Sequence, residues 1–227
     1  DVCSSDLRGV DGLIIAPCQP HLAPALLKSR KRTPVVMFDR DYGTGLYPTV
    51  VSDNRQGSGE MARRMLCETG GEAFHFLCGH ADSPSILDRI DGFKAALAEN
   101  HLADDGLVLL ADQDSVEAGR RMMSSVEKSR VWPPRAFMCS SLLILEGALQ
   151  QLRATLGRVP PEVLIGTFDD HTMLDLLPNR IFSIRQNEKE LSRCVIDDLT
   201  EALAGGNHTA RRSEVPTQLV CRNLPAE

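Results

Sequence analysis

Polar side chains that can bind or activate a small molecule follow several apolar runs of this sequence. The places are Asp39 and Arg40 after Val35–Phe38, Ser140 and Ser141 after Phe137–Cys139, Asp169 after Ile165–Phe168, and Gln186 after Ile184. Ligands of open α/β sheets bind at the carboxyl ends of the strands. Carboxylates, hydroxyls and amides at these ends suit hydrogen bonding to the hydroxyls of a sugar.

The run Asp169, Asp170, His171 is also capable of acid–base chemistry, because its side chains can exchange protons. The same paired carboxylates suit sugar binding without catalysis. No nucleophile–base pair is evident, and the sequence contains no GxSxG elbow, phosphate-binding loop, HExxH motif or Rossmann glycine fingerprint. We therefore predict a binding protein and not an enzyme.

Metal binding has one weak candidate, Cys78-Gly79-His80, which supplies two ligand types but has no second pair. We interpret it as a strand end. The chain has seven cysteines, an odd number that cannot all pair in disulfides, and no CxxC motif. This pattern is typical of reduced thiols in a cytoplasmic protein. We expect most of them to be small core hydrophobes, and we predict neither a metal nor a cofactor.

The elements that must position these side chains alternate along the chain. Apolar runs predict strands at Val10–Ala16, Pro34–Asp39, Thr49–Ser52, Ala73–Gly79, Leu107–Leu110, Ala136–Cys139, Val163–Phe168, Ile181–Arg185 and Val215–Val220. Helix patterns lie between them, such as the face formed by Ile86, Ile90, Phe93 and Leu97. Strands that alternate with helices predict an α/β fold with parallel sheets flanked by helices.

Local signals place two helix starts. Asn187 with Glu190, and Asp114 with Glu117, have the spacing of a capping box. Gly57-Ser58-Gly59 falls inside a helix pattern, where we interpret it as a packing feature.

Composition excludes several classes of protein. The 227 residues are 42% hydrophobic and 25% charged, which is enough for a large folded core and excludes a disordered chain. No stretch is long and apolar enough to span a bilayer. The net charge of −6 has no basic stripe, so this part of the protein lacks the charge pattern of a duplex-binding domain.

Eight short motifs in order resemble the lactose/galactose-repressor family of bacterial transcription regulators. They are Val10-Asp-Gly-Leu-Ile-Ile15, Pro34-Val-Val-Met-Phe-Asp-Arg40, Val51-Ser-Asp-Asn54, Arg89-Ile-Asp-Gly-Phe93, Gly147-Ala-Leu149, Val159-Pro160, Phe168-Asp-Asp170 and Ile184-Arg-Gln186. Thr167-Phe168, Met173–Leu177 and Ser140-Ser-Leu142 look most like the fructose-repressor branch.

The resemblance implies a two-lobed, periplasmic-binding-protein-like fold with an incomplete N-lobe and the effector held between the lobes. The implied division is 8–51 and 184–207 for the N-lobe and 52–183 and 208–227 for the C-lobe. Residues 1–7, Asp-Val-Cys-Ser-Ser-Asp-Leu, differ from the rest and match what a common sequencing adapter would encode, so we predict a non-native tail there; the alternative is an ordinary polar N-terminal tail. The resemblance also implies a helix-turn-helix DNA-binding domain upstream of this chain.

The resemblance further implies an effector site of eight residues: Asp39, Arg40, Ser83, Ser85, Arg89, Ser141, Asp169 and Gln186. Arg40 and Arg89 suit an anionic effector such as a sugar phosphate, with fructose 1-phosphate the first to test. Two simpler interpretations stay open: Arg40 pairs with Asp39 or Asp41, and Arg89 is an exposed helix residue. An acidic residue at Asp114 puts in doubt the stacking group that relatives often place there.

The predicted function is the effector-binding and dimerisation region of a cytoplasmic regulator. Its partners would be a sugar or sugar phosphate, a second copy of the protein and operator DNA, with no membrane. The alternative is a periplasmic sugar-binding protein of a transport system, which shares the fold.

Overall fold

The computed structural model describes residues 10–17, 33–42, 45, 47–80, 82–103, 107–205 and 210–224. The chain forms two compact units. Unit 1 comprises Asp1–Asp53, Ser83–Ser85 and Asn187–Pro216, and unit 2 comprises Asn54–Asp82, Ile86–Gln186 and Thr217–Glu227. The predicted non-native tail, 1–7, lies outside the described residues.

Unit 2 is built on a six-stranded sheet with the order β10-β8-β7-β6-β4-β5. Its strands are β4 (Phe74–Cys78), β5 (Val108–Leu110), β6 (Ala136–Cys139), β7 (Leu164–Phe168), β8 (Ile181–Arg185) and β10 (Gln218–Arg222). Neighbouring strands are parallel except for β10, which runs antiparallel to β8. The predicted α/β class with parallel sheets is confirmed, and β4 to β8 therefore end at one carboxyl edge.

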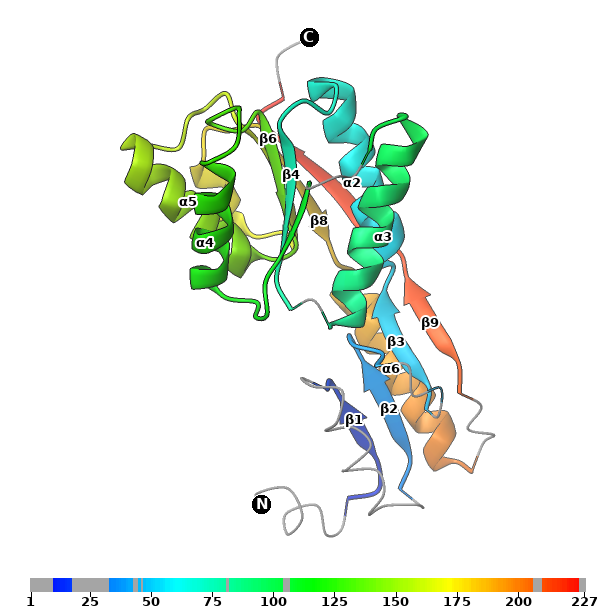
Figure 1. Ribbon diagram of the computed structural model, residues 1–227. Coiled ribbons are helices and arrows are strands. Elements are labelled where there is room, and N and C mark those ends of the chain that lie inside the picture. The colour runs from blue at the N-terminus through cyan, green and yellow to red at the C-terminus, as the bar shows by residue number, and fades with distance from the viewer. Residues whose placement is uncertain are drawn as a thin grey trace. The chain divides into compact units, whose positions relative to one another are not determined.

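Two pairs of helices cover the faces of this sheet. Helices α2 (Asn54–Thr69) and α3 (Pro84–Glu99) lie on one face, and α4 (Val116–Val126) and α5 (Leu142–Leu156) lie on the other (Figure 1). Each face has its own apolar core. The rings of Phe74 and Phe76 on β4 pack against Phe93 of α3, with centroid distances of 5.3 and 5.1 Å. The inner strands β4, β6, β7 and β8 are thus buried on both faces and are almost continuously apolar, whereas the outer strands β5 and β10 are partly exposed.

Two helix crossings require glycine. A Cβ on Gly92 would overlap the carbonyl oxygen of Arg55, where α3 crosses α2. A Cβ on Gly147 would overlap the carbonyl oxygen of Val116, where α5 crosses α4. The Gly57-Ser58-Gly59 run lies inside α2 as predicted, and the Ser58 hydroxyl donates to the carbonyl of Arg89 at 2.7 Å.

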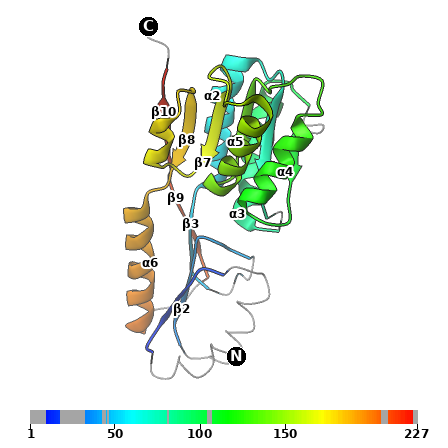
Figure 2. The ribbon, with the colours of Figure 1, turned by 90° about the vertical axis from the view of Figure 1, so that its left-hand side faces the viewer.

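Unit 1 contains a four-stranded sheet with the order β1-β2-β3-β9. Its strands are β1 (Leu13–Ile15), β2 (Val35–Phe38), β3 (Thr49–Ser52) and β9 (Arg212–Val215), all paired in parallel. Helix α6 (Glu188–Leu203) lies along one face and buries Leu191 and Val195 against it (Figure 2). Asn187 caps α6 as predicted, because its side chain accepts from the backbone N–H of Glu190 at 3.1 Å.

Two predictions about local structure are wrong. The single strand expected over Val215–Val220 is two strands, β9 in unit 1 and β10 in unit 2, separated at Pro216, which has no backbone N–H to give to a ladder. As a result, residues 212–215 belong to unit 1 instead of joining 217–227. Helix α4 is capped by Ser115, whose side chain accepts from the N–H of Ala118, and not by Asp114. Among the described residues, no helix has the length and apolarity to cross a bilayer.

Candidate functional site

The carboxyl edge of the six-stranded sheet brings together the polar groups expected in this half of the site. We call this group the carboxyl-edge cluster: Arg89, Asp114, Ser140, Ser141, Asp169 and Gln186. Five of its members follow strands β5 to β8, and Arg89 reaches the edge from α3. The predicted residues Arg89, Ser141, Asp169 and Gln186 all belong to unit 2.

Arg89 is held rigidly at this edge. Its Nε donates to Asn54 Oδ1 at 2.8 Å and its Nη1 to the carbonyl oxygen of Ser140 at 2.5 Å. The guanidinium carbon lies 3.6 Å from the centroid of the Phe168 ring, in cation–π geometry. The residue is only 6% exposed, so the interpretation of Arg89 as an exposed helix residue is wrong.

Ser140 and Ser141, which follow β6, form hydrogen bonds to the segments that follow β4 and β5. The Gly79 amide, after β4, donates to Ser140 Oγ at 3.1 Å. Ser141 caps α5 by accepting from the N–H of Ile144, and its hydroxyl donates to Asp114 Oδ1 at 2.6 Å. Both serines are buried. Asp114 was predicted to cap a helix and not to be part of the ligand site. In the structure it lies in the cluster and accepts the hydrogen bond of Ser141.

Asp169 is the second carboxylate of the cluster. Its backbone is left-handed, with φ 74°, a conformation that is unusual outside glycine and common at functional sites. Gln186 Nε2 donates to Asp169 Oδ1 at 2.5 Å, so the ends of β7 and β8 are joined through their side chains. This places a carboxylate and an amide together, the pair that sugar hydroxyls need.

Asp170 faces a different network from its neighbour Asp169. It accepts from Ser183 at 2.7 Å, from Arg185 at 2.7 and 2.9 Å, and forms an ion pair with Arg222 at 2.7 Å. Burial raises the pKa of Asp170, but the hydrogen bonds from Ser183, Arg222 and Arg185 outweigh it and lower the pKa to about 2. The Asp170 carboxylate is therefore ionised and holds the neighbouring strands together through these contacts.

His171 is also engaged locally, since its Nδ1 accepts from the N–H of Met173 at 3.0 Å at the start of the short helix η1 (Thr172–Leu176). Asp169, Asp170 and His171 thus make three separate sets of contacts. The described geometry does not assemble an acid–base pair from them.

The pKa values of two buried thiols, Cys78 and Cys139, are shifted by burial and by the charged residues of the cluster. Burial raises the pKa of Cys78 well above its ordinary value, while Arg89 lowers it and Asp114 raises it. Burial likewise raises the pKa of Cys139, and Asp114 adds to the rise. These two thiols are core hydrophobes, but they are the only buried ones among the five described cysteines, so the expectation that most cysteines are core residues is not met in this part of the chain. By contrast, Cys67 and Cys221 are exposed and Cys194 is half-buried, while Cys3 and Cys18 lie outside the described residues.

Cys78-Gly79-His80 sits at the end of β4, as the strand-end interpretation holds. Within the described ranges, no group of three metal-ligating side chains is close enough to hold an ion.

The remaining predicted residues belong to unit 1. Asp39 is left-handed, with φ 64°, and Arg40 Nε lies 3.6 Å from Asp39 Oδ2, so the ion pair left open in the sequence is present. Ser85 Oγ donates to the carbonyl of Asp39 at 2.7 Å. Ser83 and Ser85 are buried. The part of all eight predicted residues in ligand binding stays a prediction.

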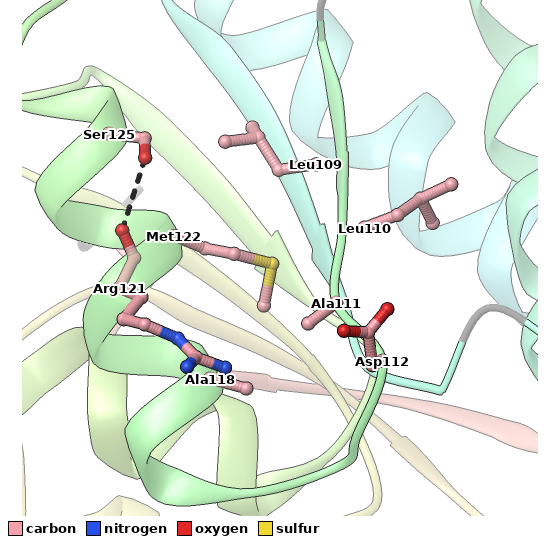
Figure 3. Close-up of a pocket in the computed structure, with 8 residues that line it drawn as sticks. All are labelled: Leu109, Leu110, Ala111, Asp112, Ala118, Arg121, Met122 and Ser125. Carbon is pink, nitrogen blue, oxygen red and sulfur yellow. Dashed lines mark hydrogen bonds between the residues drawn. The ribbon is translucent and has the colours of Figure 1, made fainter.

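A pocket also lies beside β5, the outermost strand of this sheet. It has a volume of about 430 Å³ between β5 and α4 and is lined mostly by apolar side chains (Figure 3). Asp112 and Arg121 are the charged residues on its walls. None of its lining residues belongs to the carboxyl-edge cluster.

Comparisons with known proteins point to one class. The family described as periplasmic binding protein-like domain matches residues 64–223. The sucrose operon repressor of Klebsiella pneumoniae is 26% identical over 216 residues, which are 95% of this chain and 64% of that repressor. The chain therefore spans about two thirds of the length of this curated relative.

Solved structures agree with this class. A putative ribose operon repressor from Burkholderia thailandensis superposes with a TM-score of 0.80 at 25% identity, covering 94% of this chain and 78% of that one. The Cra transcriptional dual regulator from Pseudomonas putida, solved with fructose 1-phosphate, gives a TM-score of 0.79 at 24% identity and covers 95% and 78%. At this identity the second similarity shows the fold alone.

Proposed function

Since the chain belongs to the periplasmic-binding-protein-like domain family, we propose that it is the effector-binding region of a ligand-responsive transcription regulator. The resemblance to lactose-repressor regulators is confirmed by relatives that are themselves repressors. Those relatives favour the regulator over the alternative of a periplasmic transport protein. The fructose-repressor branch stays a prediction, supported by the similarity to Cra.

The observation that carries the proposal is the carboxyl-edge cluster. A buried, stacked arginine stands among hydroxyl, amide and carboxylate groups at the edge where sheets of this type bind ligands. This mixture suits a sugar or a sugar phosphate, in which Asp169 and Gln186 would bind hydroxyls and Arg89 an anionic group. Asp39, Arg40, Ser83 and Ser85 are proposed as further effector contacts from unit 1.

The proposed regulator acts without catalysis. Effector binding would favour one conformation of the protein over another and so change operator affinity, because a ligand shifts an equilibrium by its differential affinity for the two states. In this proposal the whole protein is a cytoplasmic homodimer that contacts operator DNA through a domain outside this chain.

Calorimetry on the 227-residue chain tests the effector class. The ligands are fructose, ribose, glucose and sucrose, together with fructose 1-phosphate, ribose 5-phosphate and glucose 6-phosphate. At least one is expected to bind in the micromolar range or tighter. Asp169→Ala is expected to weaken neutral and phosphorylated sugars alike, by roughly tenfold or more.

Arg89→Ala is expected to weaken phosphorylated sugars more than neutral ones. The control is Asp91→Ala, an exposed position of α3. If every sugar and sugar phosphate fails to bind the folded chain, the sugar-effector proposal is wrong. If neutral sugars bind as well as phosphates and Arg89→Ala changes neither, only the anionic role of Arg89 is wrong.

A further inference from the structure

The pocket between β5 and α4 lies beside an open edge of the six-stranded sheet. β5 is the last strand of this sheet and pairs only with β4 among the described strands. The Ala111 amide donates to the Cys78 carbonyl at 2.9 Å, so it faces β4. Alternate residues of a parallel strand bond to one neighbour, so Leu109 also faces β4, while the N–H and C=O of Leu110 point to the open side. Backbone donor and acceptor groups are therefore available next to the pocket.

The floor of the pocket is apolar. Leu109 and Ala111 line it from the strand side, and Ala118 and Met122 line it from α4 (Figure 3). Leu110, which also lines it, is 55% exposed, an unfavourable state for a large apolar side chain. The volume of about 430 Å³ lies in the range of pockets that hold small molecules. An apolar group of a ligand would release water from this surface.

Two opposite charges stand on the walls of the same pocket. Arg121 extends from α4, and Asp112 extends from the segment that follows β5 (Figure 3). In the part of the chain that the structure describes, neither side chain forms an ion pair or a hydrogen bond, with each other or with a third residue. By contrast Arg120, the residue before Arg121, is paired with Glu117. A ligand that satisfies both open charges must carry a cation and an anion itself.

We propose that this pocket is a second ligand site, which binds an α-amino acid with an apolar side chain. The ligand carboxylate pairs with Arg121, its ammonium pairs with Asp112, and its side chain covers Leu109 and Met122. A sugar has no apolar side chain for the floor, and a simple anion is repelled by Asp112. The site shares no lining residue with the carboxyl-edge cluster, so the inference goes beyond the proposed effector binding and does not depend on it.

Calorimetry of the 227-residue chain with L-leucine, L-methionine and L-phenylalanine tests the site. At least one of them is expected to bind, with a Kd below about 1 mM. Arg121→Gln and Asp112→Asn should each weaken its binding about tenfold or more, because each removes one charge-assisted contact. The matched controls are Arg120→Gln, whose side chain does not line the pocket, and Asp91→Asn on the exposed side of α3. Both controls should bind the amino acid as wild type does.

Analogues of the bound amino acid assign the two contacts. One analogue is the amine that lacks the carboxylate, and the other is the acid that lacks the ammonium. Removal of the ligand carboxylate and Arg121→Gln should not add, since both remove the same ion pair. Removal of the ligand ammonium and Asp112→Asn should not add either, whereas the crossed combinations should. Amide chemical shifts follow the weaker complexes and locate the ligand, with the largest changes expected at Leu110, Ala111 and Met122.

The outcomes are distinct. Failure of all three amino acids to bind the folded wild type overturns the proposal. Binding whose largest shifts lie at Asp169 and Gln186 also overturns it, because the amino acid then occupies the carboxyl-edge cluster. Equal losses in Arg121→Gln and Arg120→Gln, or additive losses in every combination, overturn the assignment of the two charges. Asp112 and Arg121 are exposed, so the variants should fold, which thermal melting checks. The sugar panel tests the proposed function separately.

Discussion

The guanidinium of Arg89 lies over the ring of Phe168, its central carbon 3.6 Å from the ring centroid. One side chain of α3 thereby contacts the end of β7, the first residue of α2 through Asn54, and the end of β6 through the Ser140 carbonyl. A buried arginine is tolerated only when its donors are satisfied in this way. The consequence is that Arg89 supports the cluster as well as forming part of it.

Replacing Arg89 should therefore cost stability. Arg89→Ala leaves Asn54 and the Ser140 carbonyl without their donor and removes the stack on Phe168. We expect a loss of about 2–4 kcal/mol in the free energy of unfolding. Arg89→Lys should recover little of it, because an ammonium cannot stack and donate in one plane. Urea unfolding measures both variants. Arg120→Ala, which loses only an exposed ion pair, should fall within about 0.5 kcal/mol of wild type, and an equal loss there would refute the assignment.

The crossing of α2 and α3 predicts a second stability effect. Gly92→Ala places a methyl group on the carbonyl oxygen of Arg55, which is backbone and cannot rotate away. We expect the helices to be forced apart, with a loss of about 2 kcal/mol or more despite the better helix propensity of alanine. Asp91→Ala is the control on the exposed side of α3. A Gly92→Ala protein as stable as wild type in thermal melts would show that the crossing can relax.

Much of the secondary structure of unit 2 was predictable because it follows from the hydrophobic pattern of short sequence segments. The runs that form β4, β6 and β7 are apolar on both faces of the sheet, and the pattern Ile86, Ile90, Phe93, Leu97 gives α3 its buried side. Polar residues directly after such runs reach the carboxyl edge by topology alone, which is why the positions of Ser141, Asp169 and Gln186 at this edge could be predicted.

Other features depend on tertiary contacts that spacing does not encode. Asp114 and Ser115 both suit a helix cap, and only the Ser141 hydroxyl on another strand decides that Asp114 faces the cluster. The split of Val215–Val220 between two sheets follows from the pairing of β9 with β3 and of β10 with β8. The sequence suggests that the neighbours Asp169 and Asp170 act as a pair. However, Asp170 forms ion pairs with arginines of β8 and β10, which are distant in the sequence.

Local stability is expected to differ between the two sheets. The residues of β4 and β7 lie between paired strands and are almost all buried, whereas β1 pairs only with β2 among the described strands and Ile14 is 46% exposed. Hydrogen exchange should therefore protect the amides of Phe74–Leu77 and Leu164–Thr167 more than those of Leu13–Ile15. Mass spectrometry of peptic fragments measures this, with the solvent-exposed end of α3 as an internal reference for fast exchange. Equal protection of the three strands would contradict the expectation.

Asp170 gives the protein a defined acid sensitivity. Its pKa of about 2 in the folded state lies below the ordinary aspartate value, so the folded state binds this proton less readily than the unfolded state does. The stabilisation is complete above about pH 5, is lost as the pH falls toward 2, and amounts to roughly 1–2 kcal/mol after allowance for solvent screening. Asp170→Asn should be less stable than wild type at pH 7, and the difference should shrink steadily between pH 5 and pH 2.

Urea midpoints measured at each pH for wild type, Asp170→Asn and the exposed control Asp91→Asn test this directly. The control removes the general effect of one fewer carboxylate, since Asp91 has no ion pair among the described residues. A difference between wild type and Asp170→Asn that stays constant from pH 7 to pH 2 would mean that the network recognises the shape of the side chain and not its charge. A difference that vanishes only in the acid range would establish that Ser183, Arg185 and Arg222 hold an anion at the junction of β7, β8 and β10.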